Sequence, residues 1–340
     1  MGRPGRGANQ AWHHEPVVSS QLEWAVAGGL AGWAAARLTG ADRLHRTEDW
    51  AAPLLSFTPQ VAAGAIAAAL ALRGRGPRLT AALAAGVLTA TVAPRALPRR
   101  ARSADGPGLR VLTANLFISR VAADPLVQLV AATGTEVLFL QELTDDAVAD
   151  LDRAGIARLL PHRVIEPVAQ GPRGNGIYSR YPLRDERDSA RTPLRSREYR
   201  HSAARPVCEL ALPSGGAVRL GCVHTRAPTP NRPQHAAARW RSQLIQLPAP
   251  GDLPLILAGD FNATLDHAHF RALLSRGYID AARQVGHGLA MTWGPTPSSR
   301  ALLALDHVVA DSRCAVHATS VHQLPGTDHR AVYAELQLPR

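Results

Sequence analysis

The sequence predicts an α/β sandwich preceded by about three transmembrane helices, and three observations support this prediction. Apolar stretches dominate residues 22–97, whereas strand-like and helix-like runs alternate from residue 109 onward. Short turns join some of the strand-like runs and helices join others, which favours a sandwich of mixed sheets over a purely parallel sheet. Polar residues that can bind a metal or move a proton end four of these runs. A chain of 340 residues is long enough for both parts.

The N-terminal region is predicted to be helical and inserted in a membrane. Residues 1–21 are polar and rich in Gly, Arg and His, so we expect a disordered tail. Apolar stretches follow at 22–38, 54–72 and 79–97, and a helix needs about 20 apolar residues to cross a bilayer. The second and third stretches lack the polar face that a surface helix needs, which favours membrane insertion over a soluble bundle. Residues 98–108 are rich in Pro, Arg and Gly and are predicted to form a linker.

The distribution of charge along the chain indicates which partners the protein could bind and how it would be oriented in a membrane. The chain has no lysine, and its net charge of +11 divides into +6 over residues 1–105 and +5 over residues 106–340. A nucleic-acid-binding protein usually has a denser basic stripe than the second value implies, whereas the first suits anionic lipid headgroups. Arginines between the second and third apolar stretches indicate a cytoplasmic loop, although arginines at 95–102 argue the other way. We expect a multi-pass cell-membrane protein with its C-terminal domain outside the cytoplasm.

From residue 109 the chain is predicted to form one domain that ends at residue 340. Asp124-Pro125 marks the start of a helix, and the runs 203–212 and 217–224 flank a Pro-Ser-Gly-Gly turn and are predicted to pair as a hairpin. Further strands are predicted at 111–115, 136–142, 254–260, 303–310 and 331–338, and further helices at 144–154, 232–246 and 267–276.

The chain has three cysteines, Cys208, Cys222 and Cys314, which are too few for a disulfide framework. Buried free thiols are favoured, and a bridge between Cys208 and Cys222 across the predicted hairpin is the alternative.

The strand ends carry the candidate metal ligands. Hydrolysis of a phosphate ester requires that charge on the phosphoryl oxygens be neutralised, and a divalent cation can do this. Magnesium prefers hard oxygen ligands, among them one or two carboxylates. Glu142 ends an almost continuous apolar run and is the best candidate ligand, and Asn115 ends the preceding strand and can offer its amide oxygen.

The remaining strand ends carry candidates for proton transfer. The run 254–260 leads into Gly259-Asp260-Phe261-Asn262, where Asp260 can activate water and Asn262 can donate to a phosphate oxygen. His329 can hold a phosphate oxygen or move a proton, and Asp306 can fix its tautomer, which leaves Asp328 for metal or water. His224 can place a second imidazole over the phosphate. His307 is expected to point to the opposite face of its strand and to be structural.

These residues together resemble the endonuclease/exonuclease/phosphatase superfamily, the deoxyribonuclease I-like hydrolases, from about residue 109 to residue 338. Residues 174–183 also resemble the central strand and turn of that family. The resemblance implies a four-layer sandwich of two mixed sheets with helices outside, and cleavage of phosphate mono- or diesters that depends on Mg²⁺ or Mn²⁺. Thr327 stands where the family more often has Ser. Bacterial members with a few membrane helices before this domain are similar in layout, and their hydrolase domain generally lies outside the cytoplasmic membrane.

By position, the resemblance also assigns roles. Glu142 would bind the metal with help from Asn115 and with Asp328 nearby. Asp260 would activate water, and Asn262 would contact the scissile phosphate. His329, paired with Asp306, would stabilise the transition state, and His224 would lie near the phosphate.

The substrate is predicted only as a phosphate ester: nucleic acid, a lipid headgroup or a small phosphoester. Arg226 and Arg232 follow His224 and are expected near the site, whereas Tyr178 is a weaker candidate for substrate contact than for strand packing. Seven arginines within 184–205 are predicted to form a solvated loop rather than a substrate-binding rim. No protein partner is indicated. The alternatives to a membrane-anchored hydrolase are a catalytically silent binding or scaffold protein on the same fold, and a soluble phosphoesterase with a packed helical N-terminal region.

Overall fold

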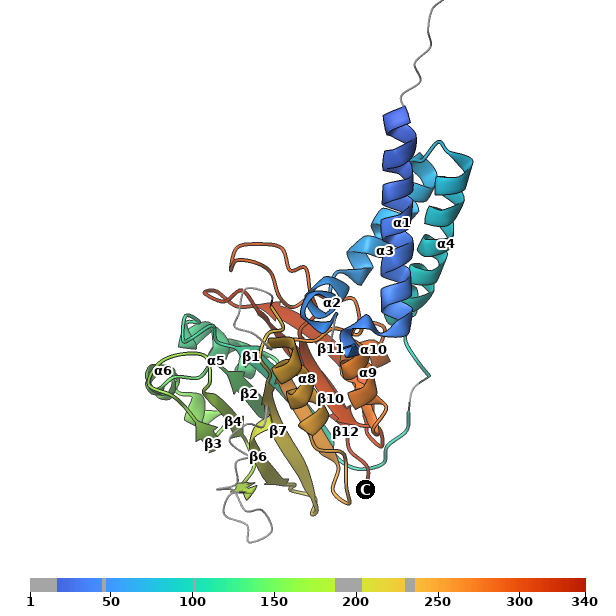
Figure 1. Ribbon diagram of the computed structural model, residues 1–340. Helices are drawn as coiled ribbons and strands as arrows, with labels where there is room; N and C mark the ends of the chain where they lie inside the picture. The colour runs from blue at the N-terminus through green and yellow to red at the C-terminus, as the bar shows by residue number, and fades with distance from the viewer. Residues whose placement is uncertain (1–16, 45–46, 101, 187–203, 230–235) are drawn as a thin grey trace, which may run out of the picture.

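The computed structural model describes residues 17–44, 47–100, 102–186, 204–229 and 236–340, which form a helical region and an α/β sandwich (Figure 1). Residues 17–21, which were predicted to be part of a disordered tail, belong instead to the first helix. The rest of that predicted tail, Arg232 and most of the arginine-rich loop (residues 187–203) lie outside the described residues.

Two mixed sheets form the sandwich, as the sequence predicts. Within the described residues each has six strands, in the orders β11-β12-β1-β2-β4-β3 and β5-β6-β7-β8-β10-β9. The pairs β1–β2 and β7–β8 are parallel and the other neighbours are antiparallel. The strands of the first sheet are β1 (Gly108–Asn115), β2 (Val137–Gln141), β3 (His162–Glu166), β4 (Asn175–Ser179), β11 (Ala315–Gln323) and β12 (Arg330–Gln337). Those of the second are β5 (Leu183–Asp185), β6 (Ala204–Ala211), β7 (Ala217–His224), β8 (Leu255–Asp260), β9 (Tyr278–Asp280) and β10 (Asp306–Asp311).

Alternation along the strands divides the core between the two faces of each sheet. Val111 and Phe139 of the first sheet pack against Ile256 of the second, whereas Leu112 and Leu138 point outward. The outward residues pack on α5 (Ala123–Ala132) and α6 (Asp145–Arg153), and the outer face of the second sheet is covered by α8 (Ala236–Gln246) and α9 (Ala268–Leu274). Helices therefore cover both outer faces. Short helices complete this part: η3 (Ile156–Arg158) and α10 (Ala281–Gln284).

The predicted hairpin and the predicted free thiols are both confirmed. β6 and β7 pair antiparallel, and Cys208 lies opposite Leu220 rather than opposite Cys222. All three cysteines are free and buried. The Cys222 thiol instead donates to the carbonyl oxygen of Leu140 in the facing sheet, over 3.2 Å.

The helical region projects from the sandwich in Figure 1 and has its own small core. It contains α1 (Val17–Thr39), η1 (Ala41–Arg43), α2 (Glu48–Leu55), α3 (Thr58–Ala71), α4 (Arg75–Val92) and η2 (Ala93–Ala96). Small residues such as Ala65 and Ala84 let α1, α3 and α4 pack closely, with Leu88 between them. Their outer surfaces are apolar, because Leu70 and Leu83 are 82% and 74% exposed. Within the described residues, the helical region therefore leaves large apolar side chains exposed.

The prediction of about three transmembrane helices is wrong in number. Among the described residues, only Arg75–Ala96 is long and apolar enough by itself to cross a membrane. The pair α2 and α3 would add a second span only if it counted as one, and it is bent by 73°. That bend divides the predicted stretch 54–72, so α3 has 14 residues and is about 21 Å long, short of the roughly 30 Å hydrocarbon layer. Glu23 and Arg37 lower the hydropathy of α1.

A fully buried carboxylate joins the helical region to the sandwich. Asp266, in the segment after β8, accepts a hydrogen bond from Arg37 Nε at 2.7 Å and from Arg95 Nη1 and Nη2 at 2.7 and 2.5 Å. Both arginines are themselves buried, one at the end of α1 and the other in η2. Burial acts to raise the pKa of Asp266, but the bonds from Arg95 and Arg37 outweigh it and hold that pKa below its usual value. The carboxylate is therefore charged and paired at neutral pH.

Further contacts extend this interface. Asp42 accepts the backbone N–H of Ala268 at the start of α9, over 2.7 Å, and Glu48 of α2 forms an ion pair with Arg241 of α8. The residues predicted to form a linker lie against the sandwich, since Gly106 N–H donates to the carbonyl oxygen of Leu338. The helical region and the sandwich are thus packed together through buried polar contacts.

We expect Asp266→Asn to lower the free energy of unfolding by about 3–5 kcal/mol, because it leaves two buried guanidinium groups without a counter-charge. Urea unfolding of the full-length protein measures this value. Asp105→Asn, at an exposed position, is the control and should change it by less than about 0.5 kcal/mol. Equal stability of the two variants would contradict the role given to the buried cluster.

Candidate active site

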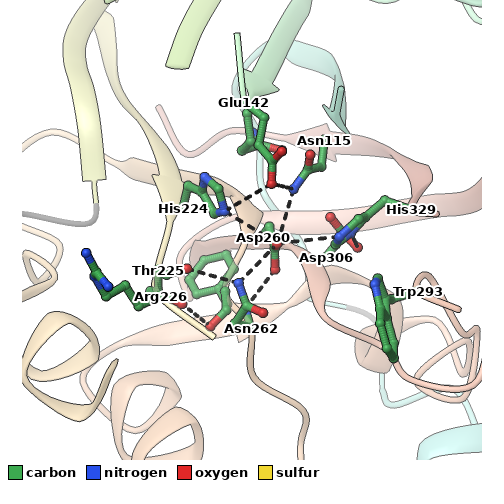
Figure 2. Close-up of polar contacts among 12 residues, drawn as sticks. Asn115, Glu142, His224, Thr225, Arg226, Asp260, Asn262, Trp293, Asp306 and His329 are labelled. Atoms are coloured by element: carbon green, nitrogen blue, oxygen red, sulfur yellow. Dashed lines mark hydrogen bonds and ion pairs between the residues drawn. The ribbon is translucent and has the colours of Figure 1, made fainter. Parts of the chain in front are cut away.

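The polar strand ends meet at one edge of the sandwich. The parallel strands β1 and β2 of one sheet, and β7 and β8 of the other, end there, while the antiparallel strands β10 and β12 begin there. Figure 2 shows the resulting cluster of side chains, which the sequence predicted and the structure brings together: Asn115, Glu142, His224, Asp260, Asn262, Asp306 and His329.

Asp260 lies at the centre of the cluster. Its Oδ1 accepts the Asn262 backbone N–H at 2.8 Å, and its Oδ2 accepts from Asn262 Nδ2 at 3.1 Å and from Asn115 Nδ2 at 3.3 Å. The Nε2 atoms of His224 and His329 lie 3.8 and 3.7 Å from the same Oδ2. Burial raises the pKa of Asp260 to about 7, although the nearby His329 acts to lower it. Asp260 is thus a carboxylate that can gain or lose a proton near neutral pH.

The backbone on either side of Asp260 is tightly constrained. Gly259 has φ +147°, and a Cβ there would lie 1.9 Å from the carbonyl oxygen of Val223, so only glycine fits. Asn262 has φ +44°, and its Nδ2 also donates to the carbonyl oxygen of Thr225 at 2.9 Å. Glu142 has φ +58°. Non-glycine residues with positive φ cost energy, and they occur mainly where surrounding contacts hold a functional side chain.

His329 and Asp306 form a buried pair. His329 Nδ1 lies 2.9 Å from Asp306 Oδ2, which also accepts from the Thr292 hydroxyl at 2.7 Å. Burial acts to lower the pKa of His329, but the charges of Asp306 and Asp260 outweigh it and raise that pKa to about 10. The imidazole is therefore a cation at neutral pH, with its Nε2–H on the side of Asp260.

Glu142 and Asp328 offer carboxylate oxygens that could hold a divalent cation. Burial raises the pKa of Glu142, and its hydrogen bond from Asn115 opposes this; Asp328 is close enough to raise it further. Asp328 Oδ2 accepts from Trp293 Nε1 at 3.0 Å, whereas its buried Oδ1 has no hydrogen-bond partner among the residues that the structure describes. Two neighbouring carboxylates with an unsatisfied oxygen fit the hard, oxygen-preferring ions Mg²⁺ and Mn²⁺.

Asn115 is oriented differently from the sequence prediction. Its amide oxygen accepts the backbone N–H of Phe117 at 3.0 Å, so its NH₂ group faces the carboxylates of Glu142 and Asp260, at 3.3 Å from each. The prediction that Asn115 offers its oxygen to a metal stays a prediction, and in this arrangement that oxygen already accepts one hydrogen bond. Asn115 connects two carboxylates as a hydrogen-bond donor.

A second group could also hold a metal by geometry alone. One ligand atom from each of Asp260, Asp306 and His329 lies within 4.8 Å of the others, and all three residues are buried. His329 Nδ1, however, already bonds Asp306, so this group has the chemistry of a proton-sharing pair. Glu142 and Asp328 are therefore the residues better suited to hold a cation.

A cleft of about 1330 Å³ is lined by six of the predicted site residues: Glu142, His224, Asp260, Asn262, Asp328 and His329. Arg226, predicted to contact substrate, is exposed and lines the cleft. Tyr178 does not line it; its side chain is buried in the outer core of the first sheet, and the prediction of substrate contact finds no support there. His307 points away from the cleft, as predicted, and bonds Asp280 at 2.7 Å and the carbonyl oxygen of Ala263 at 2.9 Å.

Some residues that line the cleft or support it from behind were not predicted. Trp293 binds Asp328 and Thr292 binds Asp306, and both precede β10 in an irregular segment without periodic signal. Thr225 could have been found, because it follows His224 directly; its carbonyl oxygen holds Asn262. Three further residues, Pro53, Ser56 and Phe57, come from the helical region.

The chain belongs to the Endonuclease/Exonuclease/phosphatase family, which it matches over residues 112–329. Members of this family are generally phosphoester hydrolases. All the candidate site residues lie within the matched range. A comparison with curated proteins finds no match.

The chain is also similar to solved structures. An endonuclease/exonuclease/phosphatase from Beutenbergia cavernae is 19% identical, with 68% of this chain and 72% of that chain covered and a TM-score of 0.47. TDP2 of D. rerio, complexed with a single-strand DNA product, is 17% identical, with 68% and 99% covered and a TM-score of 0.47. Sphingomyelinase C from Streptomyces griseocarneus is 16% identical, with 67% and 99% covered and a TM-score of 0.45. At these identities they do not indicate the substrate of this chain.

We expect Asp306→Asn to bring the pKa of His329 well below about 10, because the variant removes the nearest negative charge. Titration of the histidine ring signals by NMR measures this. Since the pKa of His329 is raised from 6.5, its pairing stabilises the folded protein fully below pH 6.5 and ceases to do so as the pH rises through about 10. The variant should therefore lose more stability below that window than above it. A His329 titration unchanged by the substitution would contradict the pairing.

Proposed function

We propose that the protein is a divalent-metal-dependent hydrolase of phosphate esters that is attached to a membrane through its helical region. The observation that supports the hydrolase is the position of Asp260, a buried carboxylate between two imidazoles and beside the Glu142–Asp328 pair. Membership of a family of phosphoester hydrolases agrees with it. A catalytically silent scaffold is disfavoured, because the predicted catalytic and metal-binding carboxylates, imidazoles and amides all lie at this edge of the sandwich.

Glu142 and Asp328 are the residues that would hold Mg²⁺ or Mn²⁺. When bound, such an ion supplies positive charge that offsets the charge on the phosphoryl oxygens. Burial raises the pKa of Glu142, and the positive charge of a bound cation would lower it and favour the carboxylate form.

The chain's own side chains provide the proton chemistry. Asp260, with a pKa of about 7, can orient water and accept its proton. His329 is a cation on the other side of Asp260, and its Nε2–H can stabilise negative charge on a phosphoryl or leaving oxygen. His224 provides a further N–H donor at the same edge, and Asn262, whose Nδ2 donates to Asp260 and to the carbonyl oxygen of Thr225, holds Asp260 in position. Asp306 keeps His329 protonated and oriented through Nδ1.

Membrane attachment is supported by the exposed apolar surface of the helical region and by the candidate span Arg75–Ala96. Arg73, Arg75 and Arg78 lie where that span begins, whereas Arg95 near its end contacts the sandwich. Arginine-rich short loops favour the cytoplasmic side of a membrane. We infer that the sandwich lies on the opposite, extracytoplasmic side.

We expect Glu142→Gln to lower kcat by more than about 100-fold, because a neutral amide holds the cation poorly and several kcal/mol of charge stabilisation are lost. A panel of plasmid DNA, phosphatidylcholine, inositol hexakisphosphate and 4-nitrophenyl esters, assayed with Mg²⁺, measures this on the substrate that reacts. Glu335→Gln, on the exposed side of β12, is the matched control. Hydrolysis that persists in EDTA would exclude the metal-dependent mechanism.

The full-length protein should remain in the membrane fraction after a high-salt wash and enter solution with detergent. Leu79→Arg together with Leu83→Arg should release it, since each charge in a span costs about 2.5–3.5 kcal/mol. Leu97→Arg, just beyond the candidate span, serves as the control and should leave the protein in the membrane fraction. Recovery of the unmodified protein in solution without detergent would refute membrane attachment.

A further inference from the structure

One wall of the cleft comes from outside the family domain. Pro53, Ser56 and Phe57 line the same cavity as Asp260 and His329, and they form the corner between α2 and α3. The family match covers residues 112–329 only, so this α2–α3 corner belongs to the helical extension of the chain. The extension therefore shapes the substrate cleft as well as projecting from the sandwich.

The α2–α3 corner is fixed relative to the catalytic residues. Ala52 is fully buried in one core cluster with Trp240 and Phe261, the residue between Asp260 and Asn262. His267 accepts the Thr264 N–H at Nδ1, so its Nε2 carries the proton and donates to the carbonyl oxygen of Ala52 at 2.6 Å.

A second anchor lies at the start of α3. Gln60 Nε2 donates to the carbonyl oxygen of Leu302 at 2.6 Å, next to Leu303, which also lines the cleft. The corner is thus held on both sides by the sandwich, and its position in the cleft is set before any ligand binds.

The α2–α3 corner offers the cleft an apolar surface. Pro53 has no polar side-chain atom, and the Ser56 hydroxyl already contacts the carbonyl oxygen of Ala52 and His267 Nε2, both at 3.4 Å. Phe57 is half-buried, so its ring is held by the protein while part of it remains accessible. Elsewhere the cleft is lined by arginines, Arg173, Arg226 and Arg239, which suit phosphate oxygens. Different parts of the cleft therefore suit the two ends of an amphipathic ester.

We propose that the α2–α3 corner is a specificity-determining subsite that contacts an apolar ester group of the substrate, chiefly through Phe57. The proposal rests on the proposed phosphoester hydrolase and narrows its substrate class to phosphoesters that carry an apolar or aromatic group. The size of the cleft agrees: about 1330 Å³ exceeds the usual 300–1,000 Å³ of a small-molecule site and leaves space beyond one phosphate. An ordered aromatic ring binds such a group at little cost in conformational entropy.

Two phosphodiesters with the same leaving group test the proposal. Bis(4-nitrophenyl) phosphate and methyl 4-nitrophenyl phosphate both release 4-nitrophenolate, and they differ only in the ester group that remains. For the full-length protein in lipid nanodiscs with Mg²⁺, Phe57→Ala should lower kcat/KM for the aromatic diester about tenfold or more, mainly through KM. The value for the methyl diester should stay within about twofold, and Phe57→Leu should retain part of the aromatic preference.

Leu54→Ala is the matched control, because Leu54 lies near the end of α2, three residues before Phe57, is exposed and does not line the cleft. This variant should leave kcat/KM for both diesters unchanged. If Phe57→Ala lowers kcat/KM equally for both diesters, Phe57 has only a structural role. If it lowers kcat/KM for neither, Phe57 does not contact the substrate. Both results overturn the proposal.

Binding separates this proposal from the proposed function. Calorimetry with phenylphosphonate and methylphosphonate needs no turnover, and the wild-type protein should bind the phenyl compound more tightly. Phe57→Ala should remove that difference. Equal wild-type affinities overturn the subsite even in an active enzyme. If the wild-type protein binds the phenyl compound more tightly and Phe57→Ala loses that preference, yet neither diester is hydrolysed, the result supports the subsite and counts against the proposed hydrolase activity.

Discussion

The buried carboxylate of Asp260 is the contact on which the arrangement of the site depends. It accepts from Asn115 of one sheet and from Asn262 of the other, so one side chain connects the two halves of the sandwich. His224, at the end of β7, and His329, just before β12, approach the same oxygen. Burial disfavours the charged form of Asp260, whereas the nearby His329 favours it. The resulting pKa of Asp260 is about 7. The two sheets must therefore pack together correctly before Asp260 has this pKa and can exchange a proton near neutral pH.

Much of the site was predictable because strand ends are visible in a sequence. Apolar runs that finish in Asn115, Glu142, His224 and Asp260 mark the ends of the parallel strand pairs, and such ends meet at one edge. Contacts that depend on irregular backbone were not predictable: the orientation of Asn115 follows from the turn at Phe117, whose φ is positive.

The predicted number of membrane-spanning helices was wrong for a related reason. A hydropathy profile registers how many apolar residues a stretch contains, but not whether its helix is bent. The bend between α2 and α3 therefore could not be predicted from the apolar pattern. That same bend carries Phe57 into the cleft. The feature that makes α3 too short to cross a membrane alone is thus the feature that gives the extension a part in the active site.

The buried cluster of Arg37, Arg95 and Asp266 has a consequence for biogenesis. The carboxylate follows its partners by 229 and 171 residues, so both arginines leave the ribosome long before their counter-charge exists. A bare guanidinium group is costly in hydrocarbon and stays in water. In the membrane attachment proposed above, these two cations would therefore limit how deeply the nascent helices enter the lipid, until the sandwich folds and encloses them.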